Sequence, residues 1–441
     1  MKSSLHFLVA ARQHEMAALE QLGKACSLVV AMSGLVHALQ KERGLSNMVL
    51  ASGGAQGAEL LAPQRLLADA QIANVRDELD RLGPHPSGGS GARLCNAIAY
   101  TLQGVTALPA LRAQVQAGRL TPPACTDAFA RLIAGCLSVV FEAADSANEP
   151  EISRMLVSLF HLMQGKELAG QERACGTSAF ASGQLQPSAR AQWLHLIESQ
   201  ERCFEVFASL ATPRVLVLWQ AHMAGDTDMA AVERMRRVAH TASGASLSRS
   251  WSADWFAACS HRLDALHGVE TLVAQELQVL CLHKLQAQEQ ALAALQALPP
   301  GAEPAQEGVK GAEGAEGSEG GMAFFEASAP PDTWSLDAVG APALGRDILS
   351  LVQQQSQRLQ TMQTQIDEAR TALHERKTLE RAKGLLMAQH QLSESDAYQL
   401  LRQTAMNQNK RMLEVAEAVL AMAALVPQAP AAPAAPAATE R

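Results

Sequence analysis

The chain has 441 residues, of which 48% are apolar, so it is long enough for two or three domains and can bury a substantial core. Aromatic residues make up only 4%, whereas alanine, leucine, methionine and glutamine are abundant. This mixture predicts an all-α protein, because strands draw on β-branched and aromatic residues. The net charge of −8 excludes general attraction to polyanions, so any nucleic-acid surface must be a local patch.

The cysteines and the apolar segments indicate the compartment. The 8 cysteines are scattered singly, which is typical of reduced, buried thiols and not of a metal site. The apolar N-terminus is short and is interrupted by Arg12, His14 and Glu15, unlike a signal peptide. No uninterrupted apolar run approaches the roughly twenty residues of a membrane span. We therefore expect a soluble, cytoplasmic protein with no membrane partner.

Residues 1–297 are predicted to form a succession of long amphipathic helices. A Gly/Pro/Ser-rich break at 82–91 ends a first pair of helices, and a Pro-Pro break follows residue 120. Helices are expected over residues 5–43, from the second break to about 144, and over 151–170, 188–210 and 253–297. So many long helices in one region indicate bundles that pack side by side.

The chain after residue 297 changes composition twice. Gly, Glu, Ala and Pro dominate residues 298–340, which predicts a flexible linker, and the Ala/Pro-rich tail at 426–441 is expected to be disordered. Between them, at 341–425, lies a second predicted domain. It begins with a heptad pattern formed by Ile348, Val352, Gln355, Leu359, Met362, Ile366, Ala369 and Leu373. This pattern favours a two-stranded coiled coil and hence a homodimer, with one helix packing on its own domain as the alternative.

Three short runs follow the heptad helix: AKGLLM at 382–387, SESDAYQLLR at 393–402 and LEVA at 413–416. An N-cap serine with an acid three residues later opens the second of three predicted short helices. From about residue 343 to 421 this segment resembles the ANTAR family of RNA-binding antitermination domains. The resemblance implies a small three-helix bundle that binds paired stem-loops of a leader mRNA, so that a terminator cannot form.

The local charge agrees with an RNA-binding role, because phosphate contact requires clustered cations. The candidate RNA-binding residues are Lys383, Arg402, Arg376, Lys377, Arg381, Lys410 and Arg411. Lys383 and Arg402 are the first candidates, and solvated helix faces are the alternative for several of the others. Tyr398 and His390 are candidates for stacking on bases. Packing roles are expected for Ala382, Gly384, Met387 and Ala397.

Two runs in the first domain, HALQKERGLSN at 37–47 and MQGKELAGQERACG at 163–176, place charges and glycines among apolar helices. Buried charge is costly unless it is paired. A third basic cluster lies at 234–237. These runs resemble the NIT family of nitrate- and nitrite-sensing domains. The resemblance implies two four-helix bundles that hold one anion between an arginine of each bundle.

The resemblance places Arg43 as the first-bundle ligand of nitrate or nitrite. For the second bundle we expect Arg236, with Arg237 as the next candidate. Gly44 and Ser46 are expected to add donors from a helix break. Guanidinium suits this task because its planar fork of donors stays charged when desolvated. The alternative is a helix-end salt bridge of Arg43 with its neighbour Glu42.

Arg173 is expected to be structural, paired with Glu42, Glu167 or Glu172. No nucleophile–base pair, phosphate loop or cluster of metal ligands is present in the sequence, so we expect neither an enzyme nor a cofactor or metal. The function predicted by the two resemblances is transcription antitermination in response to nitrate or nitrite. The alternative keeps the RNA-binding output but gives the helical sensor another small ligand or a protein partner.

Overall fold

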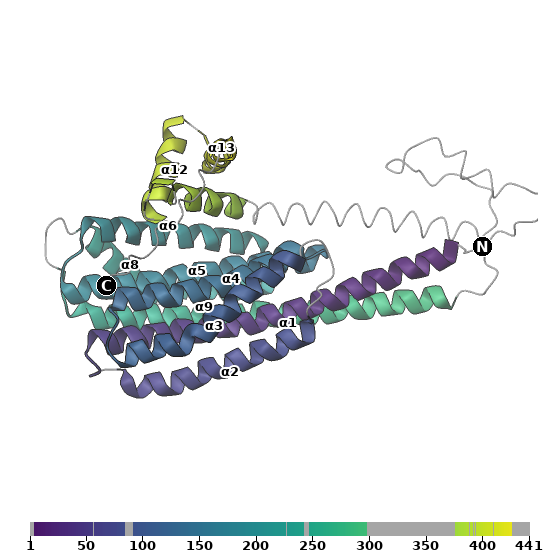
Figure 1. Cartoon of the computed structure of the whole chain (residues 1–441), viewed down its shortest axis with the longest axis horizontal. Helices are drawn as coiled ribbons and strands as arrows, with labels where there is room; N and C mark the ends of the chain where they lie inside the picture. Colours follow the sequence, from purple (N-terminus) through teal and green to yellow (C-terminus); the bar gives the residue numbers. More distant parts are fainter. Residues whose placement is uncertain are drawn as a thin grey trace, which may run out of the picture. The chain divides into compact units, whose positions relative to one another are not determined.

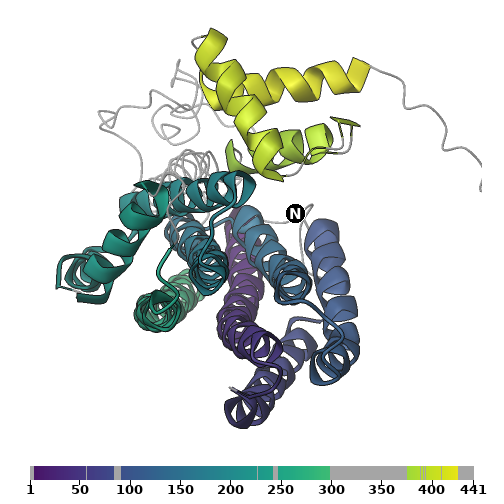
Figure 2. The same cartoon turned by 90° about the vertical axis from the view of Figure 1, so that its left-hand side faces the viewer.

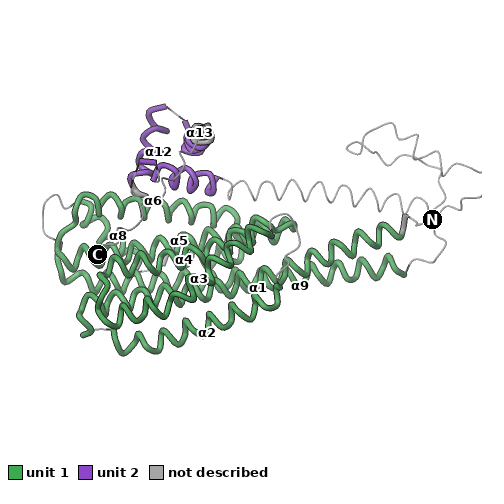
Figure 3. The backbone as a smooth tube through the Cα atoms, in the orientation of Figure 1, with its two compact units in different colours: residues 1–370 green, residues 371–441 purple. Residues whose placement is uncertain are grey.

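The computed structural model describes residues 4–55, 57–83, 91–225, 227–241, 247–297, 375–387, 389–390, 392, 394–408 and 410–425. All regular structure in these residues is helical, which confirms the all-α prediction. The chain divides into two compact units, within residues 1–370 and within residues 371–441, which Figure 3 shows in green and purple. The predicted linker, heptad run and tail lie outside the described residues.

The first unit is built from long helices (Figure 1). In chain order they are α1 (Ser4–Ala51), α2 (Ala58–Leu82), α3 (Gly91–Gln116), α4 (Pro122–Ser146), α5 (Pro150–Ser182), α6 (Pro187–Leu210), α7 (Pro213–Gly225), α8 (Thr227–Thr241) and α9 (Trp251–Gln296). Two of them are longer than expected: α1 continues past residue 43, and α5 continues past residue 170. Buried packing along both helices outweighs the modest helix-breaking tendency of their glycines.

Several helix ends follow from local chemistry. The Thr121 hydroxyl caps α4 by accepting a hydrogen bond from the Ala124 amide at 3.4 Å, and the Glu149 carboxylate caps α5 through the Ile152 amide at 2.8 Å. Both caps precede a proline, which suits the first helical turn because it lacks an N–H. At the other end of α5, Gly183 has φ 74°, a left-handed conformation that glycine adopts without strain.

The helices of the first unit pack in two groups (Figures 1 and 2). In the first group, α1 lies against α2 and α4, and α3 lies against α4. In the second group, α9 lies against α5, α7 and α8, and α6 lies against α5. The groups meet where α1 packs on α9 and α4 packs on α5. This arrangement corresponds to the expected bundles side by side, and it brings the middle of α1 against both α5 and α9.

In the part of the chain that the structure describes, three helical segments are long and apolar enough to cross a membrane by length and composition alone: His6–Ala51, Gly91–Gln116 and Pro122–Ser146. The expectation that the apolar runs are too short therefore holds only for uninterrupted runs. In the most apolar windows of α1 and α4, 61% and 50% of the residues are buried against other helices of the unit. Packing within the unit accounts for much of the apolar character of these two helices.

The described residues of the second unit form a helical segment at 375–387, α12 (Glu394–Gln408) and α13 (Met412–Leu425). Its core is formed mainly by small side chains, namely Ala382, Leu386, Ala397, Leu401, Ala405, Val415 and Ala416. Alanines at the contacts let the three short helices approach closely. The expected bundle of three short helices is therefore present.

Candidate functional site

Arg43 binds a carboxylate on a distant helix. Its guanidinium donates to Glu167 of α5, with Nη1 to Oε1 at 2.5 Å and Nη2 to Oε2 at 3.1 Å. Both side chains are almost fully buried. Gln40 of α1 and Gln171 of α5 donate to the same carboxylate at 2.9 and 3.0 Å. The Arg43 charge is therefore neutralised across the contact between α1 and α5.

Glu42 points to the opposite side of α1. It accepts hydrogen bonds from Nε and Nη2 of Arg112 on α3, both at 2.8 Å, and lies 3.6 Å from Arg65 on α2. Neighbouring residues of a helix face different directions, so one cannot neutralise the other within the same buried layer. The alternative of a salt bridge between Glu42 and Arg43 is wrong.

Glu172 forms a second buried cluster, on the next turns of α5. Arg236 of α8 donates to it through Nε at 2.7 Å and Nη2 at 2.6 Å, and Trp193 and Gln200 add hydrogen bonds at 3.0 and 2.7 Å. Arg262 of α9 lies 3.6 Å away. Burial raises the pKa of Glu172, but the attraction of Arg236 outweighs it, so the pKa falls below its ordinary value. Glu172 therefore stays charged.

A third ion pair joins α5 to α9. Lys166 and Glu270 are both fully buried and in direct contact, and Ser33 of α1 donates to the same carboxylate oxygen at 3.3 Å. His267 lies 3.2 Å from that oxygen. Burial raises the pKa of Glu270, but Lys166 and His267 together lower it below its ordinary value. These contacts hold α1, α5 and α9 together through one charge pair.

Two glycines make room for arginines where α1 crosses α5. A side-chain carbon at Gly170 would lie 2.6 Å from Nη2 of Arg43, and one at Gly44 would lie 2.6 Å from Nη2 of Arg173. Each helix therefore supplies one arginine and the glycine that accommodates the other helix's arginine. The expectation that Gly44 and Ser46 lie at a helix break is wrong, because α1 continues to Ala51. Gly44 provides space and not a free amide.

The prediction that Arg173 pairs with a nearby glutamate is wrong. Its Nη1 donates to the Ser260 hydroxyl at 2.9 Å, its Nη2 donates to the Gln40 carbonyl at 3.3 Å, and its guanidinium carbon lies 4.8 Å from the centre of the Phe256 ring. No carboxylate of the described residues lies within ion-pair distance of it. Burial first, and then repulsion by Arg43, lower its pKa to about 10.

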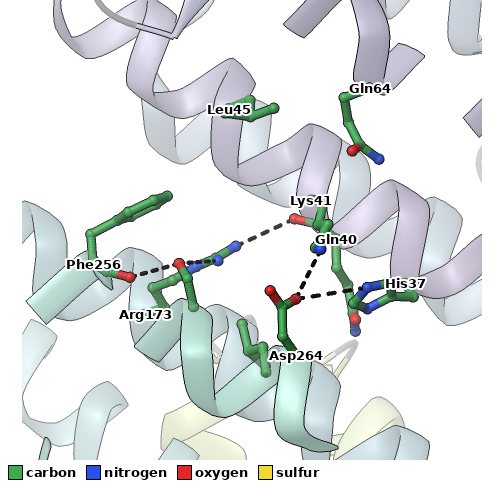
Figure 4. A pocket seen from close by; sticks show the side chains of 10 residues that line it. His37, Gln40, Lys41, Leu45, Gln64, Arg173, Phe256 and Asp264 are labelled. Carbon is green, nitrogen blue, oxygen red and sulfur yellow. Dashed lines mark hydrogen bonds and ion pairs between the residues drawn. The ribbon is translucent and has the colours of Figure 1, made fainter. Parts of the chain in front are cut away.

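Arg173 lines a cavity of about 170 Å³ between α1, α2, α5 and α9 (Figure 4). The cavity is lined by His37, Gln40, Lys41, Leu45, Gln64, Arg173, Phe256, Ser260, Leu263 and Asp264. At its rim the Lys41 ammonium lies 3.0 Å from Asp264, and these two side chains are 42% and 50% exposed. The cavity therefore reaches solvent at this rim and ends at the buried guanidinium.

The remaining expected anion ligands are placed as follows. Arg236 is buried and belongs to the Glu172 cluster, whereas Arg237 is exposed on the other side of α8. Arg43 and Arg236 bind carboxylates more than one turn apart on α5, so the structure brings both to one helix but not to one point. Ser46 is fully buried, and its hydroxyl has no hydrogen-bond partner among the described residues.

Sequence reasoning missed two charged residues of α9. Arg262 belongs to the Glu172 cluster, and Asp264 forms the rim of the cavity. Arg262 stands in a helical pattern whose buried positions include Cys259 and Leu263. A charge within an apolar face was the signal that identified the other motifs, and it would have identified Arg262 as well. No comparable signal marks Asp264, which is half-exposed.

In the second unit, the candidate RNA-binding residues differ in exposure. Lys383 is buried, and its ammonium lies 2.9 Å from Glu380. Arg376 lies 3.1 Å from the same carboxylate and is half-buried, as is Lys377. The exposed candidates are Arg381, Arg402, Lys410 and Arg411. Lys383 can therefore reach a phosphate only after its contact with Glu380 opens.

Other expectations for this unit are partly corrected. Ala382 and Ala397 lie in the core as predicted, but Gly384 and Met387 are exposed. Tyr398 is buried and so cannot stack on a base in this arrangement, whereas His390 is exposed. The helical period alone does not show which small residue faces the core.

Comparisons with known proteins agree with this architecture. The NIT family, described as nitrate and nitrite sensing, matches residues 34–278, and the ANTAR domain matches residues 367–420. A nitrate regulatory protein of Klebsiella oxytoca is 35% identical over 412 residues, which are 93% of this chain and 93% of that protein. A solved structure of the NasR transcription antiterminator is 32% identical with a TM-score of 0.57, covering 95% of this chain and 99% of that chain.

The NIT match includes Arg43, Arg173 and Arg236, so the buried charges lie within the part of the chain that matches a sensing family. The ANTAR match covers the second unit's three helices almost entirely. Both are domains of regulators and not of enzymes. The chain therefore belongs to the NasR-type family of regulators, in which a NIT nitrate- and nitrite-sensing domain is followed by an RNA-binding ANTAR domain.

Proposed function

We propose that this protein is a cytoplasmic antiterminator that responds to nitrate or nitrite and binds leader mRNA stem-loops upstream of nitrate assimilation genes. Bound RNA cannot form the terminator, so transcription continues. One observation carries the proposal: a single chain joins the NIT and ANTAR matches and aligns with a nitrate regulatory protein over 93% of both chains. The regulatory anion is the only small molecule that the proposal requires.

The input side of the proposal rests on the buried arginines. Arg43 and Arg236 are the proposed anion ligands, and each already holds a planar carboxylate through a two-bond fork. Nitrate is planar and singly charged, so it can replace such a carboxylate as a partner of guanidinium. Ser46 adds a buried hydroxyl next to this layer. Of the two candidates on α8, the buried Arg236 is favoured over the exposed Arg237.

Exchange of a carboxylate for an anion gives the sensor two states. In one state Glu167 and Glu172 bind the arginines, and in the other the anion takes part of their place and the contact of α1 and α8 with α5 changes. An anion can shift this equilibrium only by the difference between its affinities for the two states. The carboxylates thus compete with the anion for the arginines, and this competition sets the anion concentration at which the sensor responds.

The output side rests on the exposed cations of the second unit. Arg381, Arg402, Lys410 and Arg411 concentrate positive charge in an acidic protein, and phosphate contacts supply most of the affinity for a nucleic acid. We propose that two copies of the chain associate as a homodimer through the heptad run at 348–373. A dimer presents two ANTAR domains and therefore fits a leader RNA with two stem-loops.

Two titrations of the purified full chain test the proposal. Calorimetry with nitrate, nitrite and chloride should show saturable binding of nitrate or nitrite but not of chloride. Anisotropy of a labelled two-stem-loop leader RNA should show tighter binding when the anion is present. RNA binding that ignores both anions would support a different small ligand or a protein partner as the input. Failure to bind the RNA under any condition would contradict the output.

A further inference from the structure

Two of the eight cysteines meet in the fold although they are far apart in the sequence. Cys26 of α1 and Cys281 of α9 are in contact through a hydrogen bond between their thiols. Both are free thiols in the structure. The packing of α1 on α9 brings them together, so no local pattern in the sequence marks the pair.

Contacts on either side of the pair hold the two helices in register. On one side Ser33 of α1 donates to Glu270 of α9 at 3.3 Å, and on the other Arg12 donates to Gln288 at 3.3 Å. Figure 1 shows α1 and α9 running side by side. The packing of the helix pair therefore holds the two sulfurs together, and they need only close from hydrogen-bond distance to about 2 Å to form a covalent bond.

The two thiols differ in exposure and in acidity. Cys26 is only 1% exposed, whereas Cys281 is half-buried on a stretch of α9 that also exposes Val279 and Leu282. The hydrogen bond from Cys26 lowers the pKa of Cys281 below its ordinary value, although burial and the charge of Glu149 act in the opposite direction. The same hydrogen bond, together with burial, raises the pKa of Cys26. Because the thiolate is the reactive form, Cys281 is the thiol that meets an oxidant from solvent first.

We propose that Cys26 and Cys281 form a redox-reactive pair that a hydroperoxide oxidises to a disulfide, which ties α1 to α9 in their present packing. The thiolate of Cys281 attacks one oxygen of hydrogen peroxide and breaks the O–O bond, and the departing hydroxide takes up a proton to become water. Cys281 is then a sulfenic acid. The sulfur of Cys26 attacks that of Cys281, and its proton leaves with the hydroxyl group as a second water. The two thiols thus lose the two electrons that reduce the peroxide.

The chemistry suits a protein of a reducing compartment. Disulfides there are usually transient and serve catalysis or redox sensing, because the thiol pools of the cell reduce them again. This one would join the first helix of the sensor to α9, the last described helix before the ANTAR domain. The inference goes beyond the proposed antitermination and does not depend on it, since the reaction needs only the packing of α1 on α9.

Peptide mapping of the full chain under native conditions tests the inference. The probe is hydrogen peroxide, followed by alkylation of the remaining thiols and digestion with trypsin. Cleavage after lysine and arginine places the two cysteines in separate peptides, 25–41 and 263–284, neither of which contains another cysteine. We expect these two peptides to be linked after peroxide treatment and to separate when a dithiol reductant is added.

Single variants test the order of the reaction. In Cys26→Ser the sulfenic acid at Cys281 has no partner thiol, so dimedone should trap it there, and Cys26→Ala should give the same result if serine destabilises the core. In Cys281→Ser the buried Cys26 should stay unoxidised and unlabelled. The matched control is Cys95→Ser, because Cys95 is half-buried like Cys281 but lies on α3, which carries no second cysteine. This control should form the linked peptides as the unmodified chain does.

Thermal unfolding of the oxidised chain tests whether the bond forms within the present packing. The disulfide closes most of the sensor into one covalent loop, so its formation should raise the Tm by about 5–10 °C. The rise should be absent in Cys26→Ser. A lower Tm after oxidation would show that the bond distorts the helix packing, and it would overturn the geometry proposed for the pair.

Two results of the mapping would overturn the inference. One is a native chain in which Cys281 is oxidised to a sulfenic or sulfinic acid without the linked peptides. The other is linkage of Cys281 to several different cysteines, because that pattern comes from unfolded chains. Failure of the chain to bind nitrate, nitrite or RNA would contradict the proposed function alone and leave the cysteine pair standing.

Discussion

The pair of Lys166 and Glu270 allows a quantitative test of the buried charges. Both side chains are fully buried, so Lys166→Met leaves a carboxylate whose remaining partners are Ser33 and His267. Removing one partner of a buried ion pair typically costs about 3–5 kcal/mol, because the other charge stays desolvated. We expect a loss of this size in the free energy of unfolding for Lys166→Met, and a similar loss for Glu270→Gln.

The double variant Lys166→Met/Glu270→Gln is expected to recover much of that loss. It removes both charges, and the glutamine oxygen still accepts hydrogen bonds from Ser33 and His267. For two residues in contact, the change in unfolding free energy of the double variant differs from the sum of the two single changes by about 0.5–3 kcal/mol. We expect a difference in the upper half of this range. Urea unfolding followed by tryptophan fluorescence measures it, because the four described tryptophans all lie in the sensor unit. Those tryptophans are Trp193, Trp219, Trp251 and Trp255.

The pH dependence of Lys166→Met gives an independent check. Lys166 helps to lower the pKa of Glu270, against burial, which raises it. Without Lys166 the pKa should rise above its ordinary value of 4.5, so the folded variant takes up a proton that the unfolded chain releases. The cost of the substitution should therefore be larger at pH 8 than at pH 5. A cost below about 1 kcal/mol, or strict additivity in the double variant, would refute this account.

Three further predictions follow from single sites. Burial lowers the pKa of His37 from 6.5 to about 2, so stability should fall below pH 6.5, where only the unfolded chain binds the proton, by about 2 kcal/mol at pH 5. Urea unfolding at pH 5 and pH 7.5 should show that His37→Gln lacks this component, and an unchanged pH dependence would contradict it. Gly176→Ala would place a carbon 2.4 Å from the Trp255 ring and should lower the free energy of unfolding by about 1–3 kcal/mol. Gly268→Ala, on open surface, is the control and should not lower it. Equal stability of the two variants would disprove the packing argument. Arg402→Gln should weaken leader-RNA binding for all sequences alike and reduce the slope of log affinity against log salt by about one, and an unchanged slope would exclude a phosphate contact.

The sequence by itself determined the all-α class and the approximate positions of several long helices, but it did not single out α7 and α8. Apolar residues recur with the helical period, and prolines mark the starts of α4, α5, α6 and α7. These signals act between residues close together in the chain, so they can be recognised without knowing the tertiary structure. The charged motifs at 37–47 and 163–176 could be singled out for the same reason, because charges among apolar helical positions require partners.

Only the tertiary structure decided which partners those charges have. Arg43 and Glu167 are 124 residues apart, Lys166 and Glu270 are 104 apart, and Arg236 and Glu172 are 64 apart. Each pairing depends on how two helices cross and rotate, and that geometry is set by packing, such as the fit of arginines against Gly44 and Gly170. The same geometry leaves Arg173 without a glutamate at ion-pair distance among the described residues and places it at the wall of a cavity. No local pattern in the sequence contains this information, because the contacts form between helices and not within them.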